Sequence, residues 1–224
     1  MSERATHHDE ARARDQRLFE LWSKVYEATP LLGPLLRQLQ RQAVVELDPV
    51  WGERILDLGG GTGVGSARLS TRLGRHGEVV TLDLSLPMLK RSGARRFEAP
   101  IHRVCADALA LPFADESFDG ILCTNSFHHY PDPKRALAEM RRVLRPGGRL
   151  VLVDPSADSL LVRAFIEIAE RRLLKLHHVH LHGLAEWRAM LTDAGFARVE
   201  VRRAGAFLPT HRGMALVRAE VPSP

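Results

Sequence analysis

The chain has little of what would tie it together covalently or carry it through a membrane. Its 224 residues include two cysteines, Cys105 and Cys123, and each lies in an apolar run typical of a strand. We therefore expect two buried thiols and no disulfide or metal site.

No apolar run is long enough to span a bilayer, and the polar segment 1–17 lacks the apolar stretch of a secretory signal. We expect a cytoplasmic protein.

Lysine is scarce as well. The chain has four lysines, so its net charge of +5 rests almost entirely on arginine, and the arginines are scattered in pairs such as Arg141-Arg142. No block is dense enough for a nucleic-acid-binding arm, and we expect these pairs on solvated helix faces. Hydrophobic residues make up 45% of the chain, which is enough for the packed core of one domain.

Strands and helices alternate through the middle of the chain, after a helical preface that ends near Pro49. Apolar segments typical of buried strands occupy residues 54–58, 78–82, 101–105, 118–123 and 149–154. Segments with helical spacing lie between them, at residues 64–73, 85–95 and 133–144. In the last third we predict helices at 156–176 and 184–194 and strands at 197–203 and 213–220. This order indicates an α/β fold, with helices on both faces of a parallel sheet.

The most informative segment, residues 55–63, reads ILDLGGGTG and runs from a strand straight into a helix. Its glycines let the backbone turn sharply and lie against a ligand, and the N–H groups that begin the helix suit an anionic group. The spacing does not fit a dinucleotide loop, because Val64 or Ser66 stands where a third glycine or alanine is needed. The Gly-Lys-Ser/Thr of a phosphate loop is absent. The spacing present is Asp57-x-Gly59-x-Gly61-x-Gly63.

This spacing resembles the first motif of the class I S-adenosylmethionine-dependent methyltransferases. Four further segments resemble that family in the same order, namely Asp83-Leu84, residues 105–108 (CADA), residues 118–125 (FDGILCTN) and residues 144–150 (LRPGGRL). The resemblance implies a Rossmann-like, doubly wound sheet of seven mostly parallel strands with the last strand antiparallel. It also implies an N-terminal helical cap (1–48) and a methyltransferase domain (49–224) with a lid or acceptor segment near 155–185.

The resemblance implies S-adenosyl-L-methionine as the cofactor and suggests the residues that bind it. In the family a carboxylate at the position of Asp83 holds the ribose hydroxyls, which suits an acceptor-only group facing two donors. Leu84 would lie against the adenine and Asp107 would meet its amino group. Tyr26 would cover the cofactor unless it is an ordinary core anchor. The full predicted set is Tyr26, Asp57, Gly59, Gly61, Gly63, Asp83, Leu84, Asp107, Ala108 and Asn125.

His128 and Asp154 follow the fourth and fifth strands at their carboxyl ends, and those strands are neighbours in the family's sheet. An oxygen acceptor needs a base, and histidine is suited to that role near neutral pH. We predict that His128 is the general base and that Asp154 orients its ring. The alternative is that the segment His128-His129-Tyr130 only shapes the loop, with one histidine bonded to backbone.

A second group of histidines consists of His177, His178, His180 and His182. In a strand the last three would share one face, which would suit a metal, but no carboxylate or cysteine is expected beside them to complete a site. We expect no metal. We interpret the group as lining for the acceptor pocket, because the segment after the fifth strand forms that lid in similar enzymes.

The predicted function is methyl transfer from S-adenosyl-L-methionine to an oxygen or nitrogen of a small molecule. The alternative is a lipid or quinone methyltransferase, with the apolar segment 160–168 in peripheral contact with a membrane. A nucleic-acid methyltransferase is disfavoured, because residues 124–127 (TNSF) lack the prolines of the amino-methylating motif and no Pro-Cys nucleophile occurs. A cofactor-binding protein without turnover is also disfavoured, since the glycine motif is intact.

Overall fold

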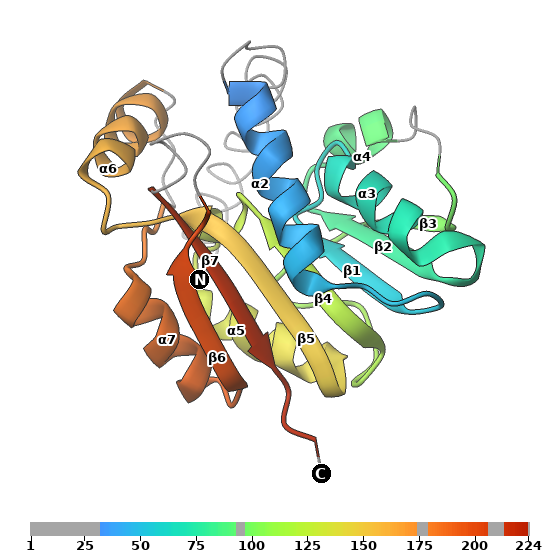
Figure 1. The fold of residues 1–224 in the computed structure, drawn as a ribbon. Coiled ribbons are helices and arrows are strands. Elements are labelled where there is room, and N and C mark those ends of the chain that lie inside the picture. The colour runs from blue at the N-terminus through green and yellow to red at the C-terminus, as the bar shows by residue number, and fades with distance from the viewer. Residues whose placement is uncertain (1–31, 93–96, 174–178, 206–212, 224) are drawn as a thin grey trace, which may run out of the picture.

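The computed structural model describes residues 32–92, 97–173, 179–205 and 213–223 (Figure 1). One sheet runs through it, in the order β3-β2-β1-β4-β5-β7-β6. Only β7 runs antiparallel to its neighbours, which confirms the predicted seven-stranded, mostly parallel sheet with an antiparallel last strand. The strands are β1 (Arg54–Leu58), β2 (Glu78–Asp83), β3 (Ile101–Cys105), β4 (Phe118–Thr124), β5 (Leu144–Pro155), β6 (Ala197–Arg203) and β7 (Met214–Glu220).

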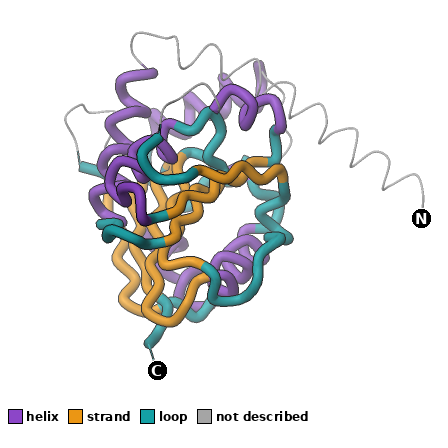
Figure 2. Tube along the Cα trace, turned by 90° about the vertical axis from the view of Figure 1, so that its right-hand side faces the viewer, coloured by secondary structure: helices purple, strands orange, loops and turns teal. Residues whose placement is uncertain are grey.

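Helices cover both faces of the sheet, as the side view in Figure 2 shows. On one face lie α2 and α3, and on the other lie α5 and α7 (Figure 1). None of the described helices has the length and apolar character needed to cross a membrane. The helical elements are α2 (Leu32–Leu47), α3 (Val64–Leu73), η1 (Gly74–His76), α4 (Leu86–Ser92), η2 (Phe127–His129), α5 (Pro133–Val143), α6 (Leu160–Ile166), η3 (Glu167–Leu173) and α7 (Leu184–Asp193).

The central strands are apolar because both of their faces are buried. Every residue of β4 is buried, and Leu122 packs beneath α2 and α3 with Leu39 and Leu69. On the opposite face Phe127 and Trp187 pack together, with ring centroids 4.7 Å apart. Such strands read as continuous apolar runs, because a strand covered on both sides has no solvent face.

The sequence predictions needed three corrections. Cys105 is exposed rather than buried, because β3 is the edge strand of the sheet, whereas Cys123 is buried as expected. The helix predicted from residue 156 begins instead at Leu160, because the Ser156 N–H donates to the Gly213 carbonyl (2.9 Å). The fifth strand extends back to Leu144, so helix α5 ends one residue before the predicted 144.

The topology places a ligand-binding edge above β1 and β4. The chain passes from β1 to β2 on one side and later returns to pair β4 on the other side, so the strand order reverses between them. In open parallel sheets, ligands bind outside the carboxyl ends of the strands at such a reversal. The glycine loop follows β1 and His128 follows β4, so both features lie at this edge.

Candidate active site

The glycine loop joins the end of β1 to α3 and is held against the end of β2. The Gly59 N–H donates to the Leu82 carbonyl at 2.8 Å. Gly59, Gly61 and Gly63 have φ angles of +67°, +52° and +77°, a region that strongly favours glycine. A Cβ atom on Gly59 would also overlap the Ser126 side chain, which follows β4. The loop therefore needs glycine for its backbone conformation and for its close approach to the neighbouring strand.

Asp83, the last residue of β2, fastens the middle of this loop. One carboxylate oxygen accepts a hydrogen bond from the Gly61 N–H at 2.9 Å, and the other accepts one from the Ser85 N–H at 2.8 Å. Burial raises the pKa of this carboxyl group, while the two backbone donors act in the opposite direction. A carboxylate accepts about four hydrogen bonds, so this one retains capacity for two hydroxyl donors such as those of a ribose.

Asp57 lies beneath the loop, almost completely buried in β1. Its carboxylate accepts a hydrogen bond from the Ser66 hydroxyl at 2.5 Å, and that hydroxyl lies 2.5 Å from the Thr81 hydroxyl. Burial raises the pKa of Asp57 to about 6, although the bond from Ser66 acts to lower it. A Cβ atom on Gly60 would lie only 2.8 Å from the same carboxylate, so acid and loop are in close contact.

The other predicted cofactor residues flank the loop, with one exception. Leu84 follows β2 and is 37% exposed. Asp107 follows β3, where its carboxylate accepts a hydrogen bond from a backbone N–H two residues later, and Ala108 is buried beside it. Asn125 follows β4 and has a φ angle of +52°. Tyr26 lies outside the described residues.

His128 and Asp154 form a buried hydrogen-bonded pair. The His128 Nδ1 and Asp154 Oδ1 atoms are 2.9 Å apart, and both side chains are at most 4% exposed. A neutral histidine in this position donates its Nδ1–H to the carboxylate, which places the lone pair on Nε2. The sequence placed both residues at the carboxyl ends of neighbouring strands, and the structure brings their side chains into contact.

The second histidine group is divided by the structure. His177 and His178 lie outside the described residues, and His180 is exposed, whereas His182 is buried. His182 Nδ1 lies 2.8 Å from a carboxylate oxygen of Glu186 in the first turn of α7, a neighbour that the sequence analysis did not identify. Within the described ranges, no group of three histidine, cysteine, aspartate or glutamate side chains is placed to hold a metal ion.

Tyr130 is a neighbour of the loop that the sequence analysis did not select. It accepts a hydrogen bond from the Ser126 hydroxyl at 3.0 Å, and its own hydroxyl would lie 3.3 Å from a Cβ atom on Gly59. Burial raises its pKa well above the usual range, so it stays protonated. Its only signal in the sequence was its place in the segment that leaves β4, which we had read for its histidines.

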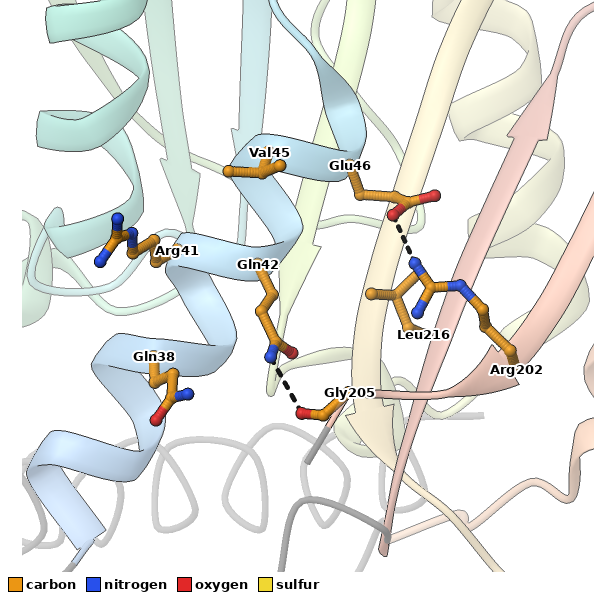
Figure 3. Close-up of a pocket in the computed structure, with 8 residues that line it drawn as sticks. All are labelled: Gln38, Arg41, Gln42, Val45, Glu46, Arg202, Gly205 and Leu216. Carbon is orange, nitrogen blue, oxygen red and sulfur yellow. Dashed lines mark hydrogen bonds and ion pairs between the residues drawn. The ribbon is translucent and has the colours of Figure 1, made fainter. Parts of the chain in front are cut away.

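The groove in Figure 3 lies elsewhere, between α2 and the end of β6. It has a volume of about 410 Å³ and contains none of the predicted site residues. Two contacts cross it, a hydrogen bond of 2.9 Å from the Gln42 side chain to the Gly205 carbonyl and an ion pair of 2.5 Å between Arg202 and Glu46. These contacts fasten α2 to β6, so the groove is a seam between packed elements.

Comparison with known proteins agrees with the geometry. Residues 56–152 match the model of the methyltransferase domain family. The chain is 36% identical over 220 residues to a demethylmenaquinone methyltransferase of Clavibacter sepedonicus, with 88% of each sequence covered. The chain belongs to the class I S-adenosylmethionine-dependent methyltransferases. It is thus an enzyme that uses S-adenosyl-L-methionine to methylate small molecules.

Two further relatives show how far the similarity reaches. O-methyltransferase cnsE of Penicillium expansum is 34% identical over 171 residues, which cover 73% of this methyltransferase and 59% of that protein. A solved S-adenosylmethionine-dependent methyltransferase of Thermotoga maritima superposes with a TM-score of 0.72 at 23% identity, covering 91% of this chain and 98% of that one. At 23% identity the likeness shows a shared fold, and the methyl acceptor has to be argued from the residues of the site.

We predict that Asp57 makes the stability of the methyltransferase fall as the pH rises from about 4 to 6. Its pKa is about 6 in the folded protein and 3.8 in the unfolded chain, so the folded state binds the extra proton in this window. The loss is about 3 kcal/mol at 1.4 kcal/mol per tenfold change. The difference in unfolding free energy between wild type and Asp57→Asn, measured in urea from pH 4 to 7, should shift by this amount in favour of the variant. The exposed Asp193→Asn is the matched control, and a constant difference for Asp57→Asn would contradict the prediction.

Proposed function

We propose that this methyltransferase acts on an oxygen or nitrogen of a small metabolite held above the carboxyl ends of β4 and β5. The observation that carries the proposal is the buried His128–Asp154 pair, which stands beside the glycine loop at the same edge of the sheet. Bound S-adenosyl-L-methionine supplies a methyl group already activated on a sulfonium. The remaining tasks for the protein are to orient the acceptor, exclude water and take up a proton.

The cofactor half of the site is assigned to the residues around the glycine loop. We propose that Asp83 binds the ribose hydroxyls and that Leu84 and Asp107 flank the adenine, with Ala108 beside them. Asp57, the three positive-φ glycines and Asn125 would shape the floor of this half, and Tyr26 would cover it. The support is geometric, because every described member lies at the carboxyl end of β1, β2, β3 or β4 or in the segment that follows. We also keep the proposed cap at residues 1–48 and the lid near 155–185.

In the proposed mechanism His128 acts as the general base. Asp154 holds the ring through Nδ1 and stabilises the imidazolium that forms when Nε2 takes the acceptor's proton. Both partners are buried, so the charge pair forms away from water, where electrostatic interactions are stronger. A backbone contact adds support, because the His180 N–H donates to the His128 carbonyl at 2.7 Å and ties the segment after η3 to η2.

We predict that Asp83→Asn weakens S-adenosyl-L-methionine binding by about 10- to 100-fold. The substitution removes the negative charge, and a hydrogen bond to a charged group is worth about 1.5–3 kcal/mol. Calorimetric titration with S-adenosyl-L-methionine and S-adenosylhomocysteine measures the effect. NADH is the control ligand and should not bind. Tight NADH binding, or equal affinity of wild type and variant, would sink the assignment of Asp83 to the ribose.

We predict that His128→Gln lowers turnover by about 10²- to 10⁴-fold, the usual contribution of a general base, without changing cofactor affinity. Asp154→Asn should lower it too, because asparagine does not stabilise the imidazolium. The matched control is His102→Gln, since His102 has a side chain 62% exposed on the edge strand β3. Once an acceptor is found, kcat and the pH profile decide. Near-normal turnover of His128→Gln would assign the histidine a structural role.

A second candidate function is methylation of a quinone at a membrane surface, and a specific observation favours it. The relative in Clavibacter sepedonicus is a demethylmenaquinone methyltransferase. In α6 and η3 four large apolar side chains are exposed: Leu160 and Leu161 at 78%, Phe165 at 45% and Ile168 at 54%. Their helices follow β5 at the active-site edge, so we propose that this face contacts the membrane peripherally while a lipid-soluble acceptor enters.

If that face binds membranes, the double variant Leu160→Gln/Leu161→Gln should lose most binding to vesicles that contain phosphatidylglycerol. Each leucine contributes about 1.5–3 kcal/mol when fully buried in an apolar medium, so two losses move a partition coefficient by more than tenfold. Flotation of the purified protein with vesicles measures this. Val45→Gln is the matched control, because Val45 is 55% exposed on α2. Wild-type protein that never floats with the vesicles would remove the membrane candidate.

A further inference from the structure

Three arginines gather on the seam between α2 and α3, and none of them is among the predicted active-site residues. Arg37 and Arg41 are one helical turn apart on α2, so their side chains leave the same face of the helix. Arg68 lies on α3, which packs beside α2 (Figure 1), and the positive charges of Arg41 and Arg37 both act on it. Figure 3 shows the Arg41 side chain leaving α2 on the side opposite Glu46. We call this group the arginine cluster.

The arginine cluster has no counter-charge within the described part of the chain. No carboxylate there forms an ion pair with any of its three guanidinium groups. Arg68 is partly buried, whereas Arg37 and Arg41 are exposed. Arg149, which is also partly buried, is by contrast paired with Glu53 at 2.6 Å. Arginine stays charged under all ordinary conditions, so the cluster keeps three positive charges close together.

One member of the cluster also has an unsatisfied donor. The Arg68 Nε atom is shielded from solvent and donates to no acceptor among the described residues. A buried N–H on a charged group is costly without an acceptor, because the bond to water is lost and not replaced. Burial and the positive charges of Arg41 and Arg37 together lower the pKa of Arg68, because each disfavours its charged form.

We propose that Arg37, Arg41 and Arg68 bind a phosphate group, either free or as part of a phosphate ester or lipid headgroup. A phosphate carries up to two negative charges and several acceptor oxygens, and guanidinium groups match that geometry with paired N–H donors. It would offset the repulsion along the seam, and a turn of the Arg68 side chain would bring its shielded Nε to a phosphate oxygen. The proposal uses none of the residues assigned to methyl transfer, so it is tested independently of the proposed function.

Inorganic phosphate is the first probe, tested on the full chain against sodium chloride at equal ionic strength. The unfolding midpoint of wild type should rise with phosphate and saturate, because a ligand that binds only the folded state stabilises it. Arg68→Gln and Arg41→Gln should lose most of this rise. In chloride, Arg68→Gln should unfold at or above the wild-type temperature, since like-charge repulsion is removed. Arg188→Gln, which removes an exposed arginine on α7, is the matched control and should keep the full phosphate effect.

The outcomes separate support from refutation. Equal effects of phosphate and chloride on wild type, or a full phosphate effect in Arg68→Gln, would overturn the site. Flotation with phosphatidic acid vesicles then distinguishes the sources of the phosphate. Vesicle binding that Arg68→Gln abolishes and Leu160→Gln/Leu161→Gln retains would indicate a lipid headgroup. A phosphate effect lost in Arg68→Gln, with vesicle binding unchanged, would indicate a soluble phosphate compound.

Discussion

The attachment of the glycine loop to the end of β2 is the interaction on which the cofactor half of the site depends. The Leu82 carbonyl accepts the first N–H of the loop, and the Asp83 carboxylate accepts the N–H at its middle. These bonds form only when β1 and β2 pair in the observed parallel register, with Leu58 opposite Leu82. The tertiary pairing of two strands therefore sets the backbone of the loop, which glycine alone would leave flexible.

The same edge of the sheet holds two acids in an apolar interior. Asp57 and Asp154 are each about 2% exposed or less, and burial of a carboxylate is unfavourable unless hydrogen bonds offset it. The Ser66 hydroxyl donates a hydrogen bond to Asp57, and the His128 imidazole is hydrogen-bonded to Asp154. The fold alone would be satisfied by apolar residues there, since the neighbouring buried residues, Leu56 and Leu58 in β1 and Leu152 and Val153 in β5, are apolar. Their burial at the ligand edge therefore supports the proposed site, because functional sites are where such buried acids gather.

The core of the fold was predictable because each buried strand carries its own signal. The bounds of β1, β3 and α3 agree with the predicted ones, since turn residues and glycines punctuate those segments. Cys105 was mispredicted because the apolar pattern of a strand does not say whether the strand lies at the edge of the sheet. The start of α6 failed for a similar reason, because Ser156 is held by Gly213 in a distant part of the chain.

How much of the site could be predicted likewise depended on whether its contacts are local or distant in the sequence. The glycine spacing and Asp83 could be recognised from the sequence. The motif and the residues that it contacts lie within the one unit that joins β1 to β2. The pairing of His128 with Asp154 could be inferred only through the family's strand order, and the Tyr130–Ser126 contact had no separate signal. The His182–Glu186 pair is local, four residues apart, yet it was missed because the histidine group and the helix predicted at 184–194 were interpreted as separate features.

The two halves of the proposed site also differ in how the fold supports them. The loop that faces the donor is built from backbone fixed by β1 and β2, so its chemistry follows from the fold. The proposed acceptor side consists of the segments that follow β5, and those segments pack through side chains such as Ile166 and Val179 in a small cluster of their own. A cluster of that size can change residue by residue without disturbing the sheet. His128 stands at the boundary, because its ring is held by the sheet through Asp154 and its carbonyl by the acceptor segment through His180. Through these two attachments His128 links the geometry of the sheet to that of the segment that carries His180.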